Sequence, residues 1–259
     1  MKSFMKSFLF LLSLLSLCLL SASCWDIQKG KSFEHIAPEH WRGVFVFDQE
    51  APAKLMKVKK DSVRAERVPV SFFVDSDERG VPRALKFFNG QDTTVSDSLR
   101  FFGDTLFVYF NAQETYMRLV YEVNLMEGQL FDKNENNYPI RFQAQAGKYP
   151  RYPDIRRTPT ADVSGNWSAE VADIGTDSFA TVPMLFKADK NAVSVAITAA
   201  GFIPALFLEG TIQGKQLYLS GFDGKIAAQL VAELNADGRS LQKASLRLND
   251  KLYNLIAQR

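Results

Sequence analysis

The chain has 259 residues, of which 31 are basic and 29 acidic, and its net charge is +2. This balance excludes the concentrated basic face of a typical nucleic-acid-binding protein, so nucleic acid is not an expected partner. Cysteine occurs only at Cys18 and Cys24. The chain therefore has no Cys-x-x-Cys redox motif and no thiolate cluster for zinc, and we expect no cofactor and no metal.

The N-terminus has the pattern of a secretory signal peptide. Lys2 and Lys6 precede an apolar run from Phe8 to Leu20, and the small residues Ser21, Ala22 and Ser23 follow. This order of positive, apolar and small residues is typical of a signal peptide, and the run is shorter than the ~20 residues of a membrane-spanning helix. We expect residues 1–23 to be removed and the protein to be exported.

Cys24 stands directly after the small residues, where a lipoprotein signal peptidase requires a cysteine. Lipidation of its thiol would anchor the chain to the outer or inner membrane, facing the periplasm or the cell exterior. Ser21 departs from the usual lipobox, which has leucine there, and ordinary cleavage after Ser23 is the alternative. That cleavage would leave an unpaired, exposed thiol, so we favour Cys24 as the lipidation site.

Beyond a tether at residues 24–40, short runs of β-branched and aromatic residues alternate with turn pairs such as Asn89-Gly90 and Asp223-Gly224. Regularly spaced short strands predict an all-β protein built from antiparallel sheets, as a sandwich or an open barrel. The clearest runs are residues 42–47, 68–74, 106–110, 117–123, 193–197 and 216–220.

The sequence also repeats itself. One constant offset places Gly90 on Gly201, Gly103 on Gly214 and Leu106 on Leu217. Each copy begins near a tryptophan, Trp41 or Trp167. Self-similarity of this kind indicates related structural units. We expect a first β unit at 41–149, a proline-rich linker at 150–162 and a second β unit at 163–259.

Candidate polar sites are weak. His35 and His40 lie near Glu34 and Glu39, but Pro38 interrupts any helix that would align them, so no metal site is expected. Glu122 and Glu233 recur at matching positions, where an alternating strand already places a polar residue outward. With no histidine partner for either acid, we expect no catalytic residues.

Adjacent phenylalanines form the one notable apolar feature. Neighbours on a strand point to opposite faces, so each pair should place a ring on both sides of its sheet. The outward rings could cover the second unit, a ligand cavity or a partner, and packing between the units is the favoured interpretation. This candidate apolar contact surface comprises Phe72, Phe73, Phe87, Phe88, Phe101 and Phe102.

Several stretches resemble a known family: the N-terminal accessory domain that precedes the thioredoxin-like domain in exported TlpA-like thiol-disulfide oxidoreductases of the lipoprotein type. The matching stretches are Trp41–Val44, Val68–Phe72, Tyr138–Gly147, Val163–Trp167, Leu217–Gly224 and Ala257–Arg259. In that family a domain with Cys-x-x-Cys follows. This chain has no such motif, so no catalytic residue carries over.

The resemblance implies a membrane-anchored, non-catalytic accessory or binding module. Its partners would be the membrane, reached through the N-terminal lipid, and a thioredoxin-like domain or another exported protein. One alternative is that the chain is the N-terminal part of a TlpA-like oxidoreductase whose redox domain is missing from it. A second alternative, suggested by the phenylalanine pairs, is a carrier of an apolar ligand.

Overall fold

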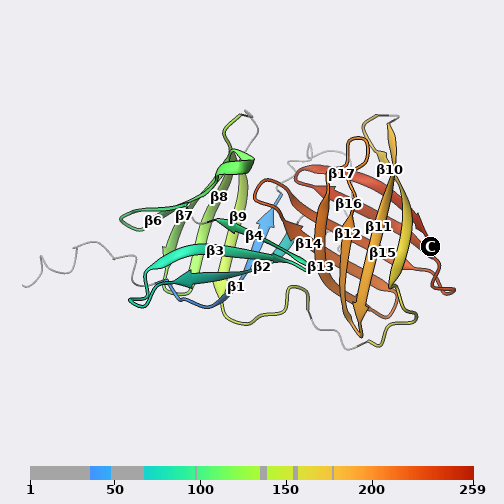
Figure 1. The fold of residues 1–259 in the computed structure, drawn as a ribbon, viewed down its shortest axis with the longest axis horizontal. Coiled ribbons are helices and arrows are strands. Elements are labelled where there is room, and N and C mark those ends of the chain that lie inside the picture. Colours follow the sequence, from blue (N-terminus) through green and yellow to red (C-terminus); the bar gives the residue numbers. More distant parts are fainter. Residues whose placement is uncertain (1–35, 48–66, 97, 135–138, 154–156, 177) are drawn as a thin grey trace, which may run out of the picture.

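The computed structural model describes residues 36–47, 67–96, 98–134, 139–153, 157–176 and 178–259. These residues form two antiparallel β units that lie side by side (Figure 1). Strands β13 and β14 of the second unit lie against β3 of the first, and β14 also contacts β2. The predicted all-β fold of two antiparallel units is confirmed.

The first unit is a nine-stranded sheet in the order β4-β3-β2-β1-β9-β8-β7-β6-β5. Strands β4 and β5 are consecutive in sequence, and they pair with β3 and β6 respectively. They are the two ends of this strand order. The bounds are β1 His40–Val46, β2 Arg67–Ser76, β3 Pro82–Asn89, β4 Asp92–Ser96, β5 Ser98–Phe102, β6 Thr105–Phe110, a 3₁₀ turn η4 at Asn111–Gln113, β7 Thr115–Glu122, β8 Leu125–Asp132 and β9 Ile140–Ala146.

The second unit is a closed barrel in which each strand pairs with the next and β17 pairs with β10. Closure corrects the sequence-based choice between a sandwich and an open barrel, because pairing β17 with β10 leaves no unpaired sheet edge. The bounds are β10 Gly165–Asp173, β11 Phe179–Asp189, β12 Ala192–Ile197, β13 Leu206–Gln213, β14 Gln216–Phe222, β15 Ala227–Leu234, β16 Ser240–Leu248 and β17 Lys251–Gln258.

The two units share a strand order and a tryptophan anchor. The Nε1 of Trp41 donates to the carbonyl of Ala37, and that of Trp167 donates to the carbonyl of Val163, each at 2.9 Å. The pairing registers are not the same throughout, since Leu106 lies opposite Leu119 whereas Leu217 lies opposite Ala232. The repeat is therefore one of strand order and of a few anchored side chains, not of every cross-strand pair.

The alternation of buried and exposed side chains along each strand determines which residues fill the core of each unit. In β11 every second residue is buried from Ala180 to Phe186, as expected for a strand with one face on the core. Strands β14 and β15 depart from this rule. Leu219–Phe222 and Ala227–Leu230 are buried at consecutive positions. Their second face is covered by the first unit, which contacts β14 through β2 and β3.

Phe222, the last residue of β14, enters the core of the first unit. Its side chain is 1% exposed and belongs to that unit's hydrophobic cluster. Its ring centroid lies 4.7 Å from that of Phe45, 5.1 Å from that of Phe87 and 5.3 Å from that of Phe110. Three strands of one unit therefore enclose a side chain of the other.

Asn89 secures the backbone of the inserted residue. Its Oδ1 accepts from the Phe222 N–H at 2.8 Å, and its Nδ2 donates to the Phe222 carbonyl at 2.9 Å. Gly221 allows this approach, because a Cβ there would lie 3.1 Å from Asn89 Oδ1, and it would also meet the Phe207 carbonyl oxygen of β13 at 2.3 Å. A turn residue of the first unit thus satisfies both buried backbone groups of Phe222.

The structure moves one predicted boundary. The tether was expected to extend to residue 40, but Ile36 is buried in the first unit's core and His40 already belongs to β1. The backbone N–H of Ala37 donates to the Val123 carbonyl at 3.1 Å, in the turn between β7 and β8. Residues 36–40 therefore pack on the first unit.

Replacing Phe222 should weaken both units together. Phe222→Ala removes a ring enclosed by three others, and we expect a loss of about 3–5 kcal/mol in the free energy of unfolding, measured by urea titration followed by tryptophan fluorescence. Phe207→Ala is the matched control, because that ring is 40% exposed on the neighbouring strand β13. Equal losses in the two variants would contradict the assigned role of Phe222.

Candidate functional site

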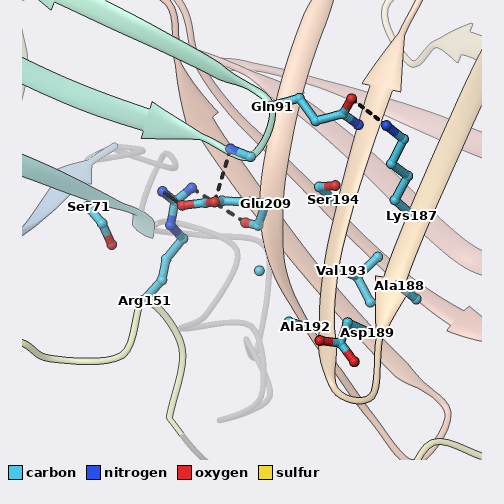
Figure 2. A pocket seen from close by; sticks show the side chains of 12 residues that line it. Ser71, Gln91, Arg151, Lys187, Ala188, Asp189, Ala192, Val193, Ser194 and Glu209 are labelled. Carbon is cyan, nitrogen blue, oxygen red and sulfur yellow. Dashed lines mark hydrogen bonds and ion pairs between the residues drawn. The ribbon is translucent and has the colours of Figure 1, made fainter.

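A polar cleft of about 520 Å³ lies between the two units (Figure 2). The first unit contributes Ser71, Gly90 and Gln91, the second contributes residues of β11, β12 and β13, and Arg151 enters from the segment that joins the units. Lys187 Nζ donates to Gln91 Oε1 at 2.7 Å across the cleft. The cleft is therefore bridged by contacts between the units.

Arg151 is the buried centre of this region, with a side chain that is 6% exposed. Its guanidinium pairs with the Glu209 carboxylate and donates to the Ser220 and Phe88 carbonyls, the latter at 2.6 Å. The other Glu209 oxygen accepts from the Gly90 N–H at 3.0 Å. One ion pair thus connects the linker, a first-unit turn and strand β13.

Burial lowers the pKa of Arg151, and the nearby Glu209 carboxylate opposes that shift. A guanidinium stays protonated under these conditions, so its charge needs the carboxylate and the carbonyl oxygens around it. These contacts use Arg151 and Glu209 for assembly of the two units. We therefore assign the cleft a structural role.

The six phenylalanines do not form one contact surface. Phe72 and Phe87 are fully buried and stack at 4.9 Å in the first unit's core. Phe73 and Phe88 lie on the outside around His40, with centroid distances of 5.2 and 6.0 Å from its ring. Phe101 meets Tyr121, and Phe102 is 65% exposed. The expected distribution of rings over both faces holds, but the shared surface does not.

A ligand cavity was one alternative interpretation of the phenylalanines, and the aromatic core of the first unit contains the ring of Phe222. This ring contacts Phe45, Phe87 and Phe110, which line the first unit's aromatic core. Phe87, an inward ring of the first unit, contacts the second unit through Phe222, whereas the outward rings Phe73 and Phe88 lie around His40.

The polar candidates lie apart. Glu122 is exposed on β7, and Glu233 on β15 pairs with Lys243 at 3.0 Å, which lowers the pKa of Glu233. His35 and the lipidation candidate Cys24 lie outside the described residues. Within the described ranges, no group of three or more His, Cys, Asp or Glu residues could hold a metal ion.

The outer face of β5 to β8 presents a second feature, which we call the aromatic–basic face. Cross-strand pairing arranges it in three rows, the first being Tyr109, Tyr116 and Phe131. The second row is Arg100, Phe107 and Arg118, and the third is Phe102, Thr105 and Val120. Strands β6 and β7 lie on the side of the first unit away from the closed barrel (Figure 1).

Rings and cations contact one another across this face. Tyr116 and Phe131 stack at 5.0 Å with an interplanar angle of 10°. The Arg100 guanidinium lies 5.4 Å from the centroid of Tyr109, and that of Arg118 lies 5.7 Å from the centroid of Phe131. Such cation–π contacts hold the charges in fixed positions while leaving them accessible to a partner.

The aromatic–basic face exposes apolar side chains to water, and this exposure does not stabilise the fold. Phe102 is 65% exposed and Val120 51%, on the strands that also carry the partly exposed rings. Scattered exposed apolar side chains are ordinary, whereas a contiguous group bordered by charges marks an interaction surface. We take this face as the candidate binding site.

Sequence reasoning missed the residues that join the units. Asn89 was interpreted as a turn residue and Arg151 as part of a linker, and no local pattern distinguishes those roles from the observed ones. The aromatic–basic face was visible in principle, because Arg100, Phe102, Phe107 and Tyr109 occupy alternate positions on two strands. That alternation predicts one shared outer face.

Comparison with known proteins adds little. No protein-family model matches the chain, and no curated protein does. One similar structure is that of a protein of unknown function from the DUF3598 family of Nostoc punctiforme. It is 12% identical, the match covers 88% of this chain and 99% of that protein's chain, and the TM-score is 0.28. A variant of transferrin-binding protein B from Haemophilus parasuis is 11% identical. The match covers 86% of this chain and 59% of that protein's chain, with a TM-score of 0.23. At these TM-scores neither match bears on function.

Loss of the Arg151 ion pair should destabilise the assembly. Arg151→Met leaves the Glu209 carboxylate and the carbonyls of Phe88 and Ser220 without this donor, and we expect a loss of about 2–4 kcal/mol in urea titration. Arg157→Met in the same segment is the control, since that residue is exposed and should change stability by less than about 0.5 kcal/mol. Equal stabilities of the two variants would refute the role of Arg151.

Proposed function

We propose that this protein is an exported lipoprotein, anchored through Cys24, that works as a non-catalytic accessory or binding module. The anchor would place it on the outer or inner membrane, facing the periplasm or the cell exterior. No helix in the described part of the chain is long and apolar enough to cross a membrane.

The aromatic–basic face carries the proposal of binding. It combines exposed apolar side chains with cations held over rings, and it lies outside both hydrophobic cores. By contrast, three charged groups that line the inter-unit cleft, Arg151, Glu209 and Lys187, are engaged in joining the units. A binding surface is therefore better supported than a catalytic cleft.

The matching motifs support kinship with the accessory domains of TlpA-like thiol-disulfide oxidoreductases, and a thioredoxin-like domain or another exported protein remains a proposed partner. The alternative is that this chain is the N-terminal part of such an enzyme. In that case too, the residues present here would carry no catalytic thiol pair. Dithiol exchange needs an attacking thiolate and a resolving one. After signal cleavage, Cys24 is the one cysteine in the given sequence.

The anchor predicts lipid labelling that depends on one residue. Cells fed labelled palmitate should incorporate label into the wild-type protein and not into Cys24→Ala, because the cysteine sulfur would carry the diacylglycerol as a thioether and the new N-terminal amine is the other group that can be acylated. Ser23→Ala is the control, since a small residue before the cysteine is retained. Equal labelling of wild type and Cys24→Ala would refute the anchor.

The chain should also fail to reduce disulfides. In an insulin-reduction assay with dithiothreitol, adding the protein from residue 24 onward should leave the rate equal to that with dithiothreitol alone. An acceleration that persists in Cys24→Ser would show a catalytic group other than a thiol pair and contradict the non-catalytic assignment.

A further inference from the structure

We propose that the aromatic–basic face rests on the phospholipid surface to which the chain is anchored, so that the first unit binds lipid headgroups directly. This inference rests on the proposed lipid anchor at Cys24, and it names the partner of the binding face. It concerns a surface contact and not insertion across the bilayer.

The attachment of the N-terminal segment places this face near the membrane. Ala37 is hydrogen-bonded to Val123 in the turn between β7 and β8, so the first described residues of the chain lie at that turn. The segment from Cys24 to Ile36 can span at most about 40 Å when fully extended. An acylated Cys24 therefore keeps this end of β7 and β8 within about 40 Å of the bilayer.

The composition of the face changes along the strands from that end. Nearest the tether lie exposed apolar side chains, with Phe102 at 65%, Val120 at 51%, Val123 at 53% and Leu125 at 48%. The next row carries Arg100 and Arg118 around Phe107. The row beyond it carries the stacked rings of Tyr109, Tyr116 and Phe131. Apolar tips followed by arginines and tyrosines match the order of acyl chains, phosphates and headgroups at a bilayer surface.

The other end of the face points toward the second unit. Thr115 Oγ1 donates to the Gly224 carbonyl, and Lys225 pairs with Asp132 at 2.9 Å. The second unit is thus attached at the end of β7 and β8 that lies away from the tether. A membrane at the tether end would meet the apolar row first, with the second unit held farther from the bilayer.

The arginine row favours anionic lipids over neutral ones, and the carboxylates at the tether end oppose that preference. Arg100, Arg118 and Lys133 all lie over rings of this face. Carboxylates also occur at the tether end, where Asp104 and Glu122 are exposed, and Glu127 accepts from Gln143. Arg100 and Arg118 are held over rings, so they meet lipid phosphates without a large loss of side-chain freedom, whereas Lys133 lies at the end of β8 away from the tether.

The test measures flotation with vesicles. The chain from residue 24 onward, with Cys24→Ser to prevent acylation, is mixed with vesicles of phosphatidylglycerol and phosphatidylcholine in equal amounts, or of phosphatidylcholine alone. We expect binding to the anionic vesicles that weakens with added salt. Each cation removed should lower partitioning about fivefold, so Arg100→Gln/Arg118→Gln should bind about 25-fold more weakly.

Two controls separate this contact from general charge and from misfolding. Arg239→Gln/Lys251→Gln removes two exposed cations from the second unit and should bind as the wild type does. Phe102→Ser leaves the charge unchanged and should still lower binding, because its ring is exposed at the apolar end. All variants should give the wild-type circular dichroism spectrum and melting temperature, since the substituted side chains lie at the surface.

Absence of flotation with anionic vesicles overturns the proposal and leaves an acidic protein as the partner of this face. Equal losses in the two double variants overturn it as well, because binding would then follow net charge. The outcome is independent of the anchor, which the palmitate experiment tests. Labelling without vesicle binding refutes the contact alone, and vesicle binding without labelling refutes the anchor alone.

Discussion

The insertion of Phe222 into the core of the first unit is the constraint on which the rest of this molecule depends. A barrel normally fills its interior with its own inward-facing side chains, and its outer residues meet water. Here the side chain of Phe222, a residue of the second unit, packs against Phe45, Phe87 and Phe110 in the core of the first unit. The first unit therefore reaches a closely packed core only with the second unit in place.

The insertion of Phe222 requires well-placed hydrogen-bond partners for the backbone groups that it buries. The Phe222 backbone loses water, and Asn89 replaces both hydrogen bonds. Arg151 does the same for the carbonyls of Phe88 and Ser220, with Glu209 compensating its charge. Small residues permit the close approach, as Gly221 and the buried Ala227 illustrate. Removing one of these groups leaves another buried without a partner, which couples the two units energetically.

The interface also determines which surfaces remain for binding. Its strand contacts join β2 and β3 of the first unit to β13, β14 and β15 of the second, and Thr115 and Asp132 at one end of β7 and β8 also contact the second unit. Beyond that end, the outer face of β5 to β8 gathers exposed rings and cations. The tether reaches the same strands through Val123. The two units together thus present one chemically distinct face near the residues where the N-terminal segment joins the first unit.

The sequence by itself determined the all-β class with two antiparallel units and the absence of a second cysteine after Cys24, because alternation, turn pairs and cysteine count are local properties. It also placed the phenylalanine pairs on two faces, which the burial of Phe72 beside the half-exposed Phe73 confirms. Tertiary structure alone decided that the second barrel closes, that Asn89 serves as a partner for Phe222, and that Arg151 lies buried in what reads as a linker. These roles arise from contacts between residues far apart in the chain, where no periodicity in the sequence records which surfaces will meet.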